Sequence, residues 1–178
     1  MPVSEKFHKV FKAYDIRGLA PGELDADMCR AIGVSVAKHF GAPSIVVARD
    51  MRLSGVELCE AFGEGVTSQG VKVVFLGLGS TDMLYFASGA LNMPGAMFTA
   101  SHNPKEYNGI KLCGAKAAPI GEETGLFSIR DEAIKILDSG DEIIGNQDLV
   151  EERDALGAFA AHVRGFLFGA DLSSLKVV

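Results

Sequence analysis

The chain has 178 residues, 48% hydrophobic and 22% charged, a composition typical of a globular protein rather than a disordered one. Its 17 basic and 23 acidic side chains give a formal net charge of −6, which disfavours nucleic-acid binding because the phosphate backbone attracts basic surfaces. At roughly 150 residues per domain, the length corresponds to about 1.2 domains, so the sequence predicts one complete domain and a remainder.

Cysteine usage and the apolar segments indicate the compartment. Cys29, Cys59 and Cys113 are odd in number and form no CxxC pair, which favours a reducing compartment over a disulfide framework or a zinc site. The N-terminal segment lacks an apolar stretch of signal-peptide length. The long uncharged stretch at 83–101 contains glycines, an asparagine and a proline, which argue against a membrane span. We therefore expect a cytoplasmic protein.

Hydrophobic periodicity predicts alternating helices and strands in the first hundred residues. The expected elements are a helix at 28–40 closed by Gly41, a strand at 44–49, a helix capped by Ser54 and ended by Gly70, a strand at 71–76, a helix capped by Ser80 or Thr81, and a strand at 95–99. This alternation is typical of a layered α/β domain with a largely parallel sheet.

The segment that follows changes the predicted sheet from parallel to mixed. The run at 109–113 comes too soon after the strand at 95–99 for a helical crossover, so we expect an antiparallel partner or an edge strand. Apolar residues at helical spacing predict a helix over 126–137. We therefore expect a three-layer α/β domain in which a mixed, mostly parallel sheet lies between helices.

The last forty residues predict a domain edge. Residues 138–148 are acidic and lack periodicity, which is typical of a linker. An amphipathic helix over 156–167 ends at Gly169, and the apolar run at 175–178 predicts a strand without a successor. We therefore expect one domain over residues 1–148, and over 149–178 the opening helix and strand of a truncated second domain.

Several familiar motifs are missing from the sequence. It contains no Walker A loop, HExxH zinc motif, GxSxG nucleophile elbow or EF-hand loop. Residues 77–82 begin like a dinucleotide-binding fingerprint but lack its third glycine, which favours a plain strand-to-helix turn. Asp25 and Asp27 lie two residues apart in a helical segment, where their side chains face apart and cannot jointly hold a metal.

The most informative segment is residues 99–112, TASHNPKEYNGIKL, a polar loop after a buried strand. Ligands usually bind at such strand ends in α/β sheets. The segment combines a hydroxyl, an imidazole, an amide and cations, while Pro104 fixes its shape and Gly109 permits an unusual turn. Because the same residue types are common in turns, an ordinary polar turn is the alternative.

Residue chemistry narrows what this loop could do. Ser101 and His102 are adjacent, so their side chains diverge along an extended chain, and His102 is badly placed to deprotonate Ser101. This disfavours a serine hydrolase. A phosphorylated Ser101 would instead need cations and donors around a charge of about −2, and Lys111 and Arg17 could supply the cations.

Three segments of the chain, taken together, resemble the α-D-phosphohexomutases. They are Tyr14–Gly18 (YDIRG), Arg49–Gly55 (RDMRLSG) and Thr99–Lys111 (TASHNPKEYNGIK). Within this superfamily the chain is most similar to bacterial phosphomannomutase/phosphoglucomutase. The phosphoglucosamine mutase branch typically has an aspartate where this chain has Tyr107, which makes glucosamine phosphate a less expected substrate.

The resemblance implies a reversible transfer of phosphate between the 1- and 6-hydroxyls of a hexose through a bisphosphorylated sugar. It implies that Ser101 is the phosphoserine and that its phosphate oxygens bind Mg²⁺. Lys111 and Arg17 would lie beside the transferred group, for proton transfer or charge stabilisation. His102 and Asn103 would orient the loop.

The resemblance also assigns substrate contacts. These are expected from Tyr14, Arg17, Asn103 and Lys111, and the ligands would be mannose or glucose 1- and 6-phosphates and their bisphosphate. In the Arg49–Gly55 segment, a structural ion pair that braces the catalytic loop is at least as expected as substrate contact.

Family members have four domains, and their aspartate-rich magnesium loop belongs to the second. We therefore expect the other Mg²⁺ ligands beyond Val178 and no activity from this chain alone. Two alternatives stay open besides a phosphoglucosamine mutase. One is a non-catalytic sugar-phosphate-binding or interaction module that uses Arg17 and Lys111, and the other is a different serine-dependent phosphotransferase or hydrolase. Oligomeric state is not predicted by the sequence.

Overall fold

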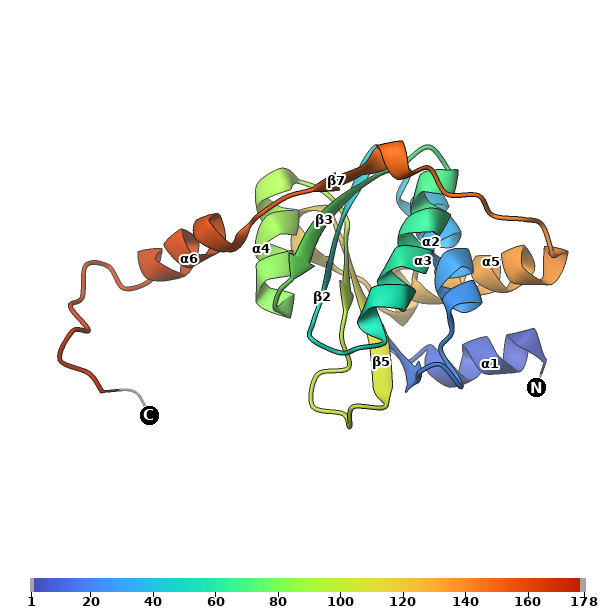
Figure 1. Cartoon of the computed structure of the whole chain (residues 1–178), viewed down its shortest axis with the longest axis horizontal. Coiled ribbons are helices and arrows are strands. Elements are labelled where there is room, and N and C mark those ends of the chain that lie inside the picture. The colour runs from blue at the N-terminus through green and yellow to red at the C-terminus, as the bar shows by residue number, and fades with distance from the viewer. Residues whose placement is uncertain (1, 177–178) are drawn as a thin grey trace.

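A mixed sheet with helices on both faces forms the centre of the computed structural model, which describes residues 2–176 (Figure 1). The helices are α1 (Val3–Val10), α2 (Ala26–Phe40), α3 (Gly55–Ser68), α4 (Thr81–Leu91), α5 (Leu126–Ser139) and α6 (Leu156–Gly165), with short 3-10 turns η1 (Ala115–Ala117), η2 (Glu122–Thr124) and η3 (Gln147–Leu149). The strands are β1 (Ile16–Leu19), β2 (Ser44–Arg49), β3 (Lys72–Leu78), β4 (Gly95–Phe98), β5 (Tyr107–Gly114), β6 (Ala118–Pro119) and β7 (Val150–Glu152).

The strand order is β1-β5-β4-β2-β3-β7, and the short β6 also pairs with β5. β2 runs parallel to β3 and β4, and β3 runs parallel to β7. β5 is antiparallel to both β4 and β1. The prediction of a mixed sheet with an antiparallel strand after residue 108 is therefore confirmed.

Helices cover the two faces of the sheet unequally. The larger core lies under α1, α2, α3 and α5, and the smaller core lies under α4. In Figure 1, α4 lies on the opposite side of the strands from α2, α3 and α5. In the larger core the rings of Phe62 on α3 and Phe98 on β4 meet edge to face, with centroids 5.5 Å apart. This contact ties α3 to the strand that leads into the predicted catalytic loop.

Helices α2 and α3 approach each other closely because glycines face backbone across their crossing. A Cβ atom at Gly33 would lie 2.2 Å from the Phe62 carbonyl oxygen, and one at Gly65 would lie 2.0 Å from the Arg30 carbonyl oxygen. Neither distance is compatible with a side chain, so the two glycines set the spacing of the helix pair.

Most of the expected helix ends are confirmed. Gly41 and Gly70 adopt left-handed φ values of 55° and 73°, and Ser80 caps α4 by accepting a hydrogen bond from the Met83 amide at 3.1 Å. The capping role predicted for Ser54 is wrong. Its Oγ accepts from Asn108 Nδ2 at 2.9 Å, and its own backbone is already helical, so it makes no capping hydrogen bond.

The C-terminal part departs from the expected pattern in two places. β7 pairs with β3, so the sheet continues past residue 148, while the division into domains there stays a prediction. The predicted helix is present as α6, which leads away from the sheet in Figure 1, and a turn carries the chain on to Gly169. Of the strand expected at 175–178, residues 175 and 176 lie outside any strand, and 177 and 178 are outside the described residues.

Across residues 2–176, no helix combines the length and the apolar character needed to span a bilayer. The cytoplasmic location stays a prediction.

Candidate active site

The predicted site lies at one end of the sheet, where several strands bring distant segments together. β4 leads directly into residues 99–107, which we call the Ser101 loop, and Figure 1 shows this loop projecting beside β5. β2 ends next to β4, so the segment Asp50–Arg52 lies close by, and the Asp50 amide donates to the Phe98 carbonyl oxygen at 2.9 Å. β1 lies on the other side of β5.

Gly109 has a different role from the turn predicted for it. It lies within β5, paired with Arg17 of β1, and a Cβ atom there would be 2.2 Å from the Ile16 carbonyl oxygen. The glycine is needed because the β1 backbone passes so close. The turn expectation is wrong, since the bend occurs earlier in the loop.

Ser101 has an unusual backbone. Its φ is +52°, in the left-handed region that non-glycine residues rarely adopt, and its side chain is exposed. Its amide donates to Thr99 Oγ1 at 3.0 Å. Strained backbone of this kind often occurs at functional sites.

The expectation that the side chains of Ser101 and His102 diverge is wrong. Ser101 Oγ lies 3.4 Å from His102 Nδ1, because the left-handed residue turns the chain back on itself. This distance is long for a hydrogen bond between a hydroxyl and an imidazole. Both side chains are exposed, so the pair lacks the buried, tightly bonded geometry of an activated serine nucleophile.

Arg17 links β1 to the Ser101 loop. Its guanidinium donates to Asn103 Oδ1 at 3.0 Å and to Asp15 Oδ2. Two residues predicted to contact substrate, Arg17 and Asn103, are therefore in direct contact, although they lie far apart in the sequence.

Asp15 is a site residue that the sequence reasoning missed. Its side chain is 3% exposed, and its Oδ2 contacts both Arg17 and Lys111, whose Nζ is 3.3 Å away. Tyr14 is largely exposed, and Lys111 Nζ lies 5.8 Å from the centre of its ring. The sequence could have indicated Asp15, because it lies two residues before Arg17 and the side chains of residues i and i+2 in an extended chain point to the same side. Asp15 thus holds two cations together beside the Ser101 loop.

Arg52 binds the backbone of the Ser101 loop. Its guanidinium donates four hydrogen bonds of 2.7 to 2.9 Å to main-chain carbonyl oxygens, and its Nε lies 3.3 Å from Asp50 Oδ2. Arg49, in contrast, makes only a 3.4 Å contact with the Asp50 carbonyl oxygen. Of the two roles expected for this segment, the geometry of Arg52 is that of a brace.

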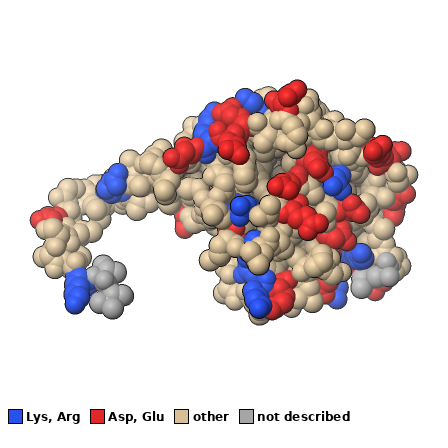
Figure 2. Space-filling model, viewed as in Figure 1, with Lys and Arg blue, Asp and Glu red and all other residues tan. Residues whose placement is uncertain are grey.

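Charge is distributed unevenly over the surface. Figure 2 shows acidic side chains gathered over α2 and α3, whereas basic and acidic side chains lie next to each other at the end where the Ser101 loop projects. At the site itself, two cations, Arg17 and Lys111, share the single carboxylate of Asp15.

The family model described as phosphoglucomutase/phosphomannomutase, alpha/beta/alpha domain I, matches residues 8–139. The chain belongs to this family. The resemblance found in the sequence and the α/β fold class are thereby confirmed, while the roles expected for individual residues stay predictions.

Relatives in this family are similar along most of the chain. The phosphohexose mutases of Xanthomonas campestris pv. campestris strain B100 are 38% identical over 171 residues, which is 94% of this chain and 37% of the relative. A phosphomannomutase of Salmonella typhimurium is 34% identical over 175 residues, with the same two coverages. A phosphoglucomutase of Neisseria meningitidis serogroup B is 36% identical over 163 residues, 89% of this chain and 34% of the relative.

Solved structures of phosphoglucomutase/phosphomannomutase family proteins are also similar to most of the chain. A phosphoglucomutase/phosphomannomutase family protein from Burkholderia thailandensis superposes with a TM-score of 0.72 at 34% identity, covering 88% of this chain and 35% of that one. A putative phosphomannomutase from Thermus thermophilus has a TM-score of 0.76 at 26% identity, covering 92% and 36%. The chain thus spans little more than a third of the length of its relatives.

The metal site expected of the phosphohexomutase family is not completed by this part of the chain. Among residues 2–176, no three or more histidine, cysteine, aspartate or glutamate side chains form a group that could hold a metal ion. Asp25 caps α2 through the Met28 amide, and Asp27 pairs with Arg30. Mg²⁺ stays a prediction, with a phosphate on Ser101 as its expected contact.

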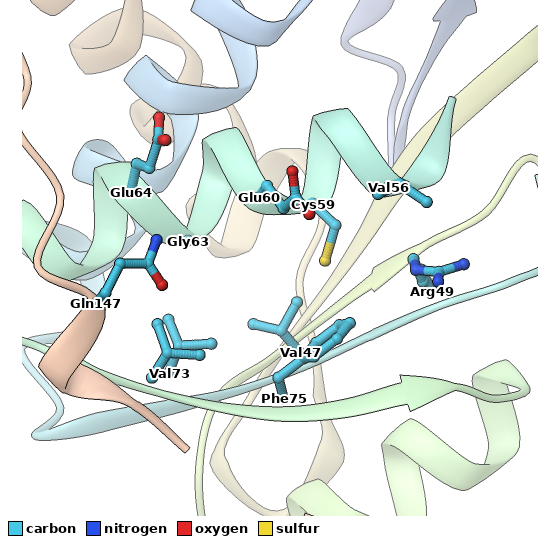
Figure 3. Close-up of a pocket in the computed structure, with 11 residues that line it drawn as sticks. Val47, Arg49, Val56, Cys59, Glu60, Gly63, Glu64, Val73, Phe75 and Gln147 are labelled. Carbon is cyan, nitrogen blue, oxygen red and sulfur yellow. The ribbon is translucent and has the colours of Figure 1, made fainter. Parts of the chain in front are cut away.

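A cavity of about 140 Å³ lies elsewhere in this phosphohexomutase domain, between α3 and the sheet (Figure 3). Val47, Val73 and Phe75 form its apolar wall, and the Cys59 thiol points toward it. Burial raises the pKa of Cys59 to about 12, so the thiol stays neutral and is a poor nucleophile. Arg49 is one of its lining residues, whereas the residues predicted for catalysis or substrate binding in the other two motifs are not among them: Tyr14, Arg17, Ser101, His102, Asn103 and Lys111.

Proposed function

We propose that this chain carries the phosphoserine part of a phosphohexomutase, which moves phosphate reversibly between the 1- and 6-hydroxyls of a hexose. The observation that supports this most strongly is the exposed, left-handed Ser101 in a loop that Arg17 contacts through Asn103, with Arg17 and Lys111 sharing the buried carboxylate of Asp15. The printed names of the relatives, phosphomannomutase and phosphoglucomutase, support mannose and glucose phosphates as substrates.

The proposed reaction has two half-reactions. In the first, a hydroxyl of the hexose monophosphate attacks the phosphorus on Ser101, so a new sugar P–O bond forms as the bond from Oγ to phosphorus breaks. The hydroxyl proton passes to the departing Oγ, with Lys111 as the proposed relay. In the second, the other phosphate of the bisphosphate transfers to Oγ in the same way, which restores the phosphoserine.

Stabilisation of charge is the main task in phosphoryl transfer. Arg17 can bind two phosphate oxygens with its planar fork, whereas Lys111 supplies a point charge. Asp15 would keep both side chains in place, and Tyr14, His102 and Asn103 would complete the contacts to substrate and loop. Mg²⁺ bound to the phosphate oxygens would neutralise further charge.

The test is intact-mass analysis of the chain after incubation with glucose 1,6-bisphosphate and Mg²⁺. We expect one phosphate on the wild type and on Ser139→Ala, an exposed serine remote from the Ser101 loop, and none on Ser101→Ala. A phosphate that persists in Ser101→Ala would remove Ser101 from its role. Sugar-phosphate binding without any transfer would support the binding-module alternative instead.

Labelling needs one transfer per chain, whereas catalysis needs repeated turnover. We expect negligible conversion of mannose 1-phosphate to mannose 6-phosphate by residues 1–178 alone, because the described residues contain no cluster of three or more His, Cys, Asp or Glu side chains that could hold Mg²⁺ beside the phosphate on Ser101. Sustained conversion by this chain would contradict that part of the proposal.

A further inference from the structure

The Ser101 loop is folded around one guanidinium group. Arg52 Nη1 donates to the carbonyl oxygens of Pro104 and Tyr107, at 2.7 and 2.8 Å. Its Nη2 donates to those of Ser101 and Asn103, at 2.9 and 2.8 Å. Four of the five N–H donors of Arg52 are thus used by a single loop.

Besides Arg52, short local contacts hold the backbone of the loop: the Ser101 amide donates to Thr99 Oγ1 at 3.0 Å, and the Glu106 carbonyl oxygen accepts from the Ala20 amide at 2.9 Å. Within the loop, the Asn103 amide donates to the Ala100 carbonyl oxygen and the Tyr107 amide donates to that of Pro104. These two turns leave the carbonyls of Ser101 and Asn103 to be satisfied by Arg52. The left-handed backbone of Ser101 is unfavourable for a serine and persists only where surrounding contacts impose it.

Asp50 orients Arg52 from two directions. Its Oδ1 accepts from the Arg52 amide at 3.0 Å, and its Oδ2 lies 3.3 Å from Arg52 Nε. The second contact is electrostatic, because the Nε–H has no aligned hydrogen-bond acceptor. The Arg52 side chain is only 9% exposed, so its charge is poorly screened by water.

We propose that Arg52 is the positioning residue of the Ser101 loop. By binding the four carbonyl oxygens it fixes the left-handed turn that presents Ser101 Oγ, and it places a buried positive charge beneath that residue. The part of this inference that concerns phosphate rests on the proposed function, because a phosphoserine brings a charge of about −2 that a nearby cation stabilises. The part that concerns the loop backbone is independent of the proposed function.

A lysine is not expected to replace Arg52. An ammonium group has three donors around one point, whereas the four carbonyl oxygens approach two separate nitrogens of a planar fork. Free guanidinium ion, which has the right shape and charge, is expected to occupy the space left in Arg52→Ala.

The first measurement concerns the backbone alone. NMR of the chain gives the amide-to-Hα coupling and the ¹³C shifts of Ser101, which report its φ. We expect the left-handed signature in the wild type and in Arg30→Ala, whose arginine pairs with Asp27 and Glu64 outside the loop. We expect it to be lost in Arg52→Ala, largely lost in Arg52→Lys, and restored to Arg52→Ala by millimolar guanidinium but not by equal sodium chloride.

The second measurement is the rate at which glucose 1,6-bisphosphate phosphorylates Ser101. We expect at least a tenfold decrease in Arg52→Ala, recovery with guanidinium, and no change in Arg30→Ala. An arginine that does not position the Ser101 loop would give neither the decrease in rate nor the recovery with guanidinium. If the wild type takes up no phosphate, the proposed function fails, while the NMR measurement still decides the role of Arg52.

The inference is overturned if Arg52→Ala and Arg52→Lys both keep the wild-type Ser101 signature. It is also overturned if Arg52→Ala is phosphorylated at the wild-type rate. Circular dichroism first checks that each variant is folded. If Arg52→Ala does not fold, the NMR signature of Ser101 and the rate of its phosphorylation in Arg52→Lys decide the question.

Discussion

A single methyl group at the crossing of α2 and α3 should force the two helices apart. In Gly65→Ala the new Cβ would lie 2.0 Å from the Arg30 carbonyl oxygen and 2.9 Å from the Val34 amide nitrogen. Ordinary contact begins at 3.4 Å, and both neighbours are backbone atoms of a packed helix that cannot rotate away as a side chain would. The helices must therefore separate by about 1 Å or more, which disturbs the packing beneath them.

The expected magnitude follows from two opposing effects. Overpacking of a well-packed core typically costs about 1–3 kcal/mol, and a clash with backbone favours the upper end. Alanine gains about 1 kcal/mol over glycine in a helix interior, which offsets part of this cost. We expect Gly65→Ala to lower the free energy of unfolding by about 2 kcal/mol.

Gly63, on the same helix, provides the matched control. A Cβ atom there meets nothing within 4 Å, so Gly63→Ala should raise the free energy of unfolding by up to about 1 kcal/mol. Urea denaturation followed by circular dichroism measures both variants, with equal m-values indicating that only stability has changed. If Gly65→Ala were as stable as Gly63→Ala, the close helix crossing would be refuted.

Two further changes test the buried groups. Asp15→Asn removes the negative charge that Arg17 and Lys111 share, so we expect the free energy of unfolding, measured in urea, to fall by about 1–3 kcal/mol and to recover in part with added phosphate. The control is Asp131→Asn, whose exposed carboxylate pairs with Arg130, and it should change the free energy of unfolding by less than about 0.5 kcal/mol. Equal losses in the two variants would contradict the shared-carboxylate geometry. Because burial raises the pKa of Cys59 from 9.0 to about 12, the folded state keeps a proton that the unfolded state releases. The stability that this protonated thiol contributes is present below pH 9 and is lost as the pH rises toward 12. Urea titrations at increasing pH should therefore show a steeper decline in the free energy of unfolding for the wild type than for Cys59→Ala. Parallel declines in the two proteins would count against the burial of Cys59.

The fold was largely predictable because its signals are local. Short apolar runs and helical periodicity gave the central strands and helices, and glycine at positions 41 and 70 ended two helices as expected. The cap at Ser54 failed because its hydroxyl is taken by Asn108, which is far away in sequence. A tertiary partner of that kind leaves no trace in the local pattern.

Most side chains of the candidate site were predictable, but Asp15 and the backbone of the loop were not. Ser101, Arg17, Asn103 and Lys111 lie in one neighbourhood, as the motifs indicated. The four bonds from Arg52 could not be foreseen, because every acceptor is a main-chain carbonyl oxygen, which all residues possess. The contact between Ser101 and His102 depended likewise on one unusual φ value.

The pairing of β1 with β5 bears on how the protein is made. A ribosome releases β1 early, yet its partner strand in the sheet is synthesised long afterwards. Until β5 emerges, Arg17 has no Lys111 beside it, and Asp15 holds only one of its two cations. A growing chain therefore lacks the pair of cations around Asp15, and it acquires the second cation only when β5 pairs with β1.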